Sequence, residues 1–90
     1  MRTQIRAALG KVDGLKFIPY VASAMGEKGT PDMIGCYQGR MFLIEAKAED
    51  GQASPIQLRR IAEWSAAGAR VGIARNADEA LGSVFGYVDA

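Results

Sequence analysis

Helical and strand-like patterns of hydrophobic positions follow one another along this chain. Residues 2–10 place Ile5 and Leu9 at helical spacing and end on a glycine, which is a common helix stop. Residues 15–22 have an extended pattern, and Pro19 within them indicates an edge or bulge position. We therefore predict a first helix followed by an edge strand.

The middle of the chain predicts a loop and then a tight hairpin. Residues 26–31 have the composition of a loop, and the runs 32–37 and 40–47 are strand-like. Gln38 and Gly39 separate the two runs, and glycine supplies the positive φ that a two-residue hairpin turn requires. In such a hairpin, the numbers of directly opposed residues sum to 77.

A second helix has a well-defined start. Ser54 is a good N-cap, Pro55 suits the first helical position, and Gln57 three residues after the cap completes a capping box. Arg59 and Glu63 stand one turn apart and can form an ion pair on its outer face. The pattern continues to a glycine at 68.

The last third of the chain predicts one more strand and a short helix. Residues 70–75 are strand-like, Asn76 caps a helix through Leu81, and residues 84–88 are apolar. The order is then α-β-β-β-α-β-α, which predicts a three-layer α/β fold around a mixed sheet. A length of 90 residues predicts a single domain, 1–90.

Composition narrows the possible chemistry. The chain has no histidine and a single cysteine, Cys36, so His-based triads, a structural zinc site and an internal disulfide are excluded. Any bound metal must therefore be a hard cation held by oxygen ligands. No apolar run has membrane length, and we expect a cytoplasmic protein without membrane partners. The net charge of +1 says little about nucleic-acid binding.

The hairpin register brings two acidic residues together. Asp32 and Glu45 sum to 77 and oppose each other, and Lys47 lies on the same face, two residues beyond Glu45. Two like charges about 5 Å apart repel by roughly 3 kcal/mol at an effective dielectric constant near 20. A divalent cation between the acids would remove this repulsion. The alternative is a surface salt bridge between Lys47 and Glu45 at a strand end.

Three segments resemble a known nuclease family. TPD at 30–32, GRMFLIEAK at 39–47 and SPIQ at 54–57 closely resemble the VRR-NUC family, a branch of the PD-(D/E)XK superfamily. The motifs cover the chain from about Gly29 to Gln57, and the order of elements extends the resemblance to the remainder. A bare PD…ExK pattern is weak, but this combination is specific.

The resemblance implies roles for particular residues. Asp32 and Glu45 would bind Mg²⁺ or Mn²⁺, the backbone carbonyl of Ala46 would be a further ligand, and Lys47 would orient or activate the attacking water. Such a cation polarises the phosphoryl oxygen and lowers the pKa of bound water. Gln57 would lie near the active site, although the capping box alone also explains a glutamine there.

One departure from the family concerns the first helix. The family usually has a metal-binding glutamate there, whereas this chain has no acidic residue before Asp13, and Gln4 stands roughly in that place. A site with one metal, or with weaker metal affinity, is expected. Basic residues that could contact a DNA backbone are Lys28, Arg6, Arg59 and Arg60.

We thus expect a metal-dependent DNA endonuclease of the small stand-alone VRR-NUC kind, phage or prophage encoded and acting in a bacterial host cell. The resemblance implies a homodimer that cuts branched DNA such as four-way Holliday junctions. Apolar residues near the C-terminus, Val84, Phe85, Tyr87 and Val88, favour an interface there. The alternative is a nuclease-fold module that binds nucleic acid without cutting it.

Overall fold

The structure is a computed structural model of the chain and describes residues 2–21 and 26–86. Its elements are α1 (Arg2–Gly10), β1 (Leu15–Pro19), β2 (Met33–Tyr37), β3 (Arg40–Ala46), α2 (Pro55–Ala66), β4 (Arg70–Ala74) and α3 (Ala77–Phe85). This is the predicted order. None of the helices in the described ranges is long and apolar enough to cross a membrane.

The four strands form one mixed sheet in the order β1-β2-β3-β4. β1, β2 and β3 are antiparallel neighbours, and β4 is parallel to β3. Gln38 (φ 50°) and Gly39 (φ 79°) form the turn between β2 and β3, and two positive φ angles are typical of a type I′ hairpin. Tyr37 pairs with Arg40, which confirms the predicted register. Pro19 ends β1 at the sheet edge, where its missing N–H costs no ladder bond.

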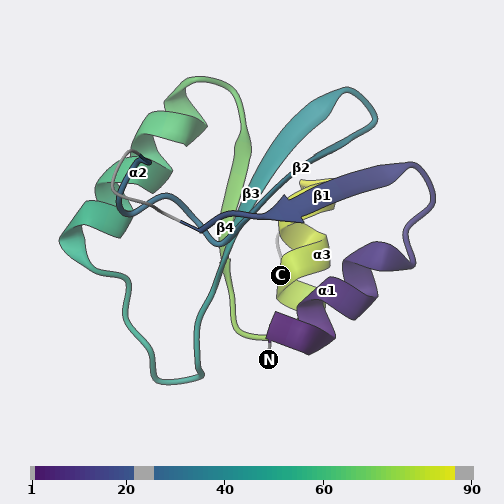
Figure 1. The fold of residues 1–90 in the computed structure, drawn as a ribbon, viewed down its shortest axis with the longest axis horizontal. Helices are drawn as coiled ribbons and strands as arrows, with labels where there is room; N and C mark the ends of the chain where they lie inside the picture. Colours follow the sequence, from purple (N-terminus) through teal and green to yellow (C-terminus); the bar gives the residue numbers. More distant parts are fainter. Residues whose placement is uncertain (1, 22–25, 87–90) are drawn as a thin grey trace.

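The hydrophobic core lies between the sheet and the pair α1 and α3. Alternate residues of β3, beginning with Phe42 and Ile44, point to this side and pack with Ile5 and Leu9 of α1 and Val84 of α3. All five are at most 2% exposed. Figure 1 shows α1 and α3 together on one side of the sheet, with α2 on the other. The predicted three-layer arrangement is confirmed.

Helix α2 lies on the other face and is itself largely exposed. It packs against β4, yet none of its residues is buried, and Leu58 is 52% exposed. The predicted capping box at Ser54 and the Arg59–Glu63 ion pair are both present. Because side chains alternate along β3, Leu43 and Glu45 point toward the side of α2, where both are at most 3% exposed.

The last helix is longer than the sequence pattern predicted. α3 begins at its cap, Asn76, and continues to Phe85 rather than Leu81. Val84 is buried in the core, and the ring of Phe85 packs edge-on against Tyr37 with ring centroids 5.4 Å apart. These two residues therefore belong to the fold, which weakens the prediction of a C-terminal interface. The other two residues of that prediction, 87 and 88, lie outside the described residues.

Candidate active site

Asp32 and Glu45 meet at the open end of the β2–β3 hairpin. Asp32 immediately precedes β2, and continuing the register Met33–Ile44 by one step places Asp32 opposite Glu45. The Glu45 residue is 3% exposed and is the single buried charged residue in the described part of the chain. The side chain of Asp32 is 24% exposed. The hairpin thus holds one carboxyl group inside the protein and one at its edge.

Burial makes Glu45 a weaker acid than an ordinary glutamate. Burial is the largest cause that raises its pKa, followed by the charge of Asp32 and a hydrogen bond between the two carboxyl groups, and together they bring the pKa to about 7. Lys47 and Arg2 act in the opposite direction, but more weakly. Near neutral pH this carboxyl group therefore favours a bound proton or a nearby cation.

Backbone contacts fix the position of Asp32. The amide of Ala46 donates a hydrogen bond to Asp32 Oδ2 at 3.0 Å, so the side chain is tied across the hairpin to β3. The Tyr20 amide donates to the Asp32 carbonyl at 2.6 Å, beyond the end of β1. Contacts from β3 and from the segment after β1 therefore determine where Asp32 lies.

Lys47 lies beside Glu45 on the same face of the sheet. Its Nζ is 3.9 Å from Glu45 Oε2, and its side chain is 20% exposed. The Lys47 amide donates to the Ala74 carbonyl at 3.0 Å, which continues the pairing with β4 past the end of β3. Because Glu45 is buried, this pair is not the exposed salt bridge of the alternative interpretation.

The structure adds a residue that the sequence analysis did not single out. Arg2 Nε lies 3.3 Å from Asp32 Oδ2, and Arg2 Nη2 lies 3.3 Å from Asp32 Oδ1. Gln4 is exposed and projects about 200° around the helix axis from Arg2, and its predicted place at the site stays a prediction. The missing glutamate in this helix indicated that its contribution to the site would differ from that of the family. Only the way in which α1 packs in the structure shows that the contributing residue is Arg2.

Gln57 lies in the capping box of α2. The Ser54 amide donates to Gln57 Oε1 at 2.9 Å, and the Gln57 amide donates to Ser54 Oγ at 3.3 Å. The cap uses the backbone N–H and the side-chain oxygen of Gln57, and it leaves the side-chain nitrogen, Nε2, out of the motif. The predicted role of Gln57 in the site stays a prediction.

The basic residues of α2 have partners within the protein. Arg60 Nη1 donates to Glu63 Oε1 at 2.8 Å, and Arg60 Nε donates to the Lys28 carbonyl at 3.0 Å, which ties α2 to the loop before Asp32. Arg59 pairs with Glu63 at 3.5 Å. Arg59 and Arg60 therefore contact protein groups, whereas Lys28 and Arg6 are exposed cations.

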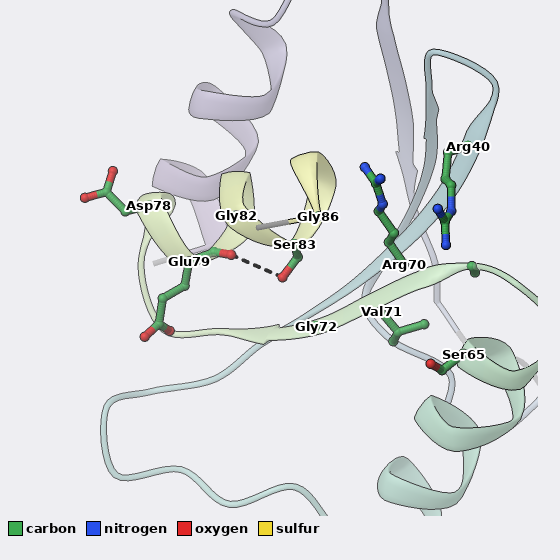
Figure 2. A pocket seen from close by; sticks show the side chains of 11 residues that line it. Arg40, Ser65, Arg70, Val71, Gly72, Asp78, Glu79, Gly82, Ser83 and Gly86 are labelled. Atoms are coloured by element: carbon green, nitrogen blue, oxygen red, sulfur yellow. Dashed lines mark hydrogen bonds between the residues drawn. The ribbon is translucent and has the colours of Figure 1, made fainter. Parts of the chain in front are cut away.

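Two of the cavities in the described part of the chain bear on the location of the site. The larger, about 670 Å³, lies along β4 beside α3 (Figure 2), where Arg70 and Arg40 donate to the carbonyls of Val84 and Gly68. The smaller, about 340 Å³, includes Asp32 in its wall. The wall of the smaller cavity consists of Arg2, Arg6, Pro19, Tyr20, Val21, Thr30 and Asp32. Neither Asp32 nor Glu45 lines the larger cavity, so the smaller one is relevant to their chemistry.

The residues at the hairpin end suit a hard divalent cation. Asp32 and Glu45 offer carboxylate oxygens, and the Ala46 carbonyl stands between Glu45 and Lys47 in sequence. Among the described residues, no group of three or more acidic, cysteine or histidine side chains gathers around a metal position. Mg²⁺ commonly takes only one or two carboxylates and keeps several waters. A bound cation would also relieve the repulsion that raises the pKa of Glu45.

Comparison with known proteins identifies the fold. No family model matches the sequence, and no curated protein matches it. A solved structure named as a VRR_NUC domain superposes with a TM-score of 0.65 at 21% sequence identity, and the match covers 91% of this chain and 84% of that chain. The chain therefore has the α/β fold of a VRR_NUC domain.

Proposed function

We propose that this protein is a divalent-metal-dependent endonuclease that hydrolyses phosphodiester bonds in DNA. One observation carries the proposal: a buried glutamate directly opposes an aspartate, with a lysine on the same face, at an open end of the sheet. When both carboxyl groups are ionised, such an arrangement destabilises the protein unless a cation neutralises it. The fold similarity to a VRR_NUC domain supports the same function.

The proposed mechanism divides the work among four residues. Asp32, Glu45 and the Ala46 carbonyl would hold Mg²⁺ or Mn²⁺, which supplies Lewis acidity and a bound water of lowered pKa. Lys47 would donate hydrogen bonds to the attacking water and stabilise the negative charge that develops on the phosphate. The hydrogen bond from the Ala46 amide keeps Asp32 oriented before substrate arrives.

The second candidate is a nuclease-fold module that binds nucleic acid without cutting it. The observation in its favour is that the Arg2 guanidinium contacts both carboxylate oxygens of Asp32. If this guanidinium cannot be displaced, a cation has no access to Asp32. The intact set of Asp32, Glu45 and Lys47 favours the nuclease.

We further propose a homodimer that acts on branched DNA, as in the stand-alone phage and prophage nucleases that the motifs resemble. The support on this molecule is exposed apolar surface: Ile18 is 53%, Leu58 is 52% and Val21 is 84% exposed. Apolar side chains that are this exposed favour association with a second copy.

Cleavage assays test the proposal directly. Purified protein is incubated with plasmid, linear duplex and a four-way junction, in Mn²⁺ and in EDTA. The nuclease predicts cleavage in Mn²⁺ alone, and the proposal on branched DNA predicts the fastest cleavage for the junction. Binding of all three substrates with no cleavage in any cation would favour the binding module instead.

A further inference from the structure

Two arginines of α1 stand over the exposed side of the candidate site. Arg2 and Arg6 are one helical turn apart, so they share a face of the helix, and both line the 340 Å³ cavity that contains Asp32. Both are exposed. Among the described residues, Arg6 makes no ion pair, so this wall carries two cations and one carboxylate.

The contact between Arg2 and Asp32 is loose. Both N···O distances are 3.3 Å, longer than the 2.7–2.9 Å that is typical of a hydrogen bond between an ionised donor and a carboxylate. The Arg2 side chain is 59% exposed and sits in the first turn of its helix. Arg2 can therefore leave Asp32 without disturbing the core.

A divalent cation and Arg2 compete for the same carboxylate oxygens. Arg2 contacts both Oδ1 and Oδ2, and Oδ2 also accepts from the Ala46 amide. A cation at Asp32 would displace the guanidinium and repel it. The displaced side chain would still be anchored beside the cavity, next to Arg6.

We propose that Arg2 and Arg6 form a phosphate-binding subsite for the DNA backbone, and that Arg2 joins it when a divalent cation takes over Asp32. This inference rests on the proposed nuclease function. A guanidinium suits the task because its planar donor set matches phosphate oxygens. The cavity volume lies in the range of ordinary ligand pockets. Arg2 thus protects the carboxylate before metal binding and positions substrate afterwards.

The salt dependence of DNA binding provides the first test. A duplex that spans the site is titrated at several salt concentrations, once in Ca²⁺, which takes oxygen ligands, and once in EDTA. In Ca²⁺ we expect Arg2→Ala to make the slope of log K against log salt shallower by about 0.9, the loss of one phosphate contact. In EDTA the two slopes should agree, because Arg2 then pairs with Asp32.

Two further variants separate charge from position. Arg2→Lys keeps a cation at this place and should restore the slope in Ca²⁺, with weaker binding because the planar donor set is lost. Lys11→Ala removes the same charge from an exposed residue beyond the C-terminal end of α1, about 13 Å farther along the helix axis. Any effect of Lys11→Ala on the slope should be the same in Ca²⁺ and in EDTA.

Metal binding without DNA is the second test. Calorimetric titration with Mn²⁺ should give an affinity at least about fivefold higher for Arg2→Ala than for the wild type, because a competing cation is gone. Unchanged or weaker Mn²⁺ binding, or an unchanged slope in Ca²⁺, would overturn the inference.

The failure of this inference can be told apart from the failure of the proposed function. If the wild type cleaves DNA while Arg2→Ala shows neither the shallower slope nor the higher Mn²⁺ affinity, this inference alone is wrong. If both effects appear but the wild type does not cleave, the proposed function alone is wrong.

Discussion

At the scale of a single residue, the raised pKa of Glu45 makes the stability of the protein depend on pH. Its pKa of about 7 in the folded protein lies above its ordinary value of 4.5, so the folded state binds more protons than the unfolded state between these values. The metal-free protein should therefore lose stability as pH rises from about 4.5 to about 7, and the loss should level off above that range. The size of the loss is about 3 kcal/mol at most.

Thermal melts in EDTA across this pH range test the expectation. Glu45→Gln should flatten the profile and melt higher than the wild type at pH 8, because no charge is then buried. Addition of Mn²⁺ at pH 8 should raise the melting temperature of the wild type more than that of Glu45→Gln. A flat wild-type profile in EDTA would mean that Glu45 ionises without cost.

Lys47 is proposed to act on the reaction and not to bind the metal. Lys47→Ala should therefore lose cleavage by at least about 100-fold while Mn²⁺ affinity remains close to that of the wild type. Lys16→Ala, an exposed lysine on β1, is the matched control. Cleavage and Mn²⁺ titration on the same preparations measure both quantities. Undiminished turnover by Lys47→Ala would contradict the assignment.

At the scale of elements, the start of α2 has to be separated from the chemistry assigned to Gln57. Gln57→Glu keeps the capping box, because glutamate serves at the same position, but it places a negative charge near the DNA. We expect its stability to stay within about 0.5 kcal/mol of the wild type and its cleavage to fall by at least tenfold. Ser54→Ala should instead cost about 1 kcal/mol of stability. If Gln57→Glu cleaves normally, Gln57 acts only in the cap.

The elements also show which features the sequence could predict. The β2–β3 register followed from a two-residue turn, because Gln38 and Gly39 fix which residues oppose one another. This local constraint placed Asp32 opposite Glu45. The contact between Arg2 and Asp32 spans 30 residues and depends on how α1 docks, which no local pattern encodes. α3 was underestimated because its last turn, with Val84 in the core, was interpreted as a separate apolar end.

At the scale of the whole molecule, the two faces of the sheet are covered unequally. α1 and α3 lie together on one side of the sheet (Figure 1), where they enclose the main core, whereas α2 on the other side has no buried residue. A short chain buries a smaller share of its surface than a long one, and 49% of these residues are hydrophobic. The exposed apolar residues are therefore expected to find cover in a second copy, and a self-complementary contact closes most simply as a two-fold dimer.

Light scattering at micromolar concentration tests the dimer. We expect the wild type to have twice the 9.6 kDa mass of the chain. Leu58, half exposed on α2, is the residue to change: Leu58→Lys should shift the mass toward the monomer, because a charge in an apolar contact is costly. Ala7→Lys adds the same charge at an exposed position of α1 and should leave the mass unchanged.

The dimer also has a consequence for the choice of substrate. Two active sites related by a two-fold axis could act on two strands of a four-way junction. Leu58→Lys should therefore also lose the preference for the junction while it still cuts DNA. A monomeric wild type would remove the dimer and leave the nuclease proposal intact.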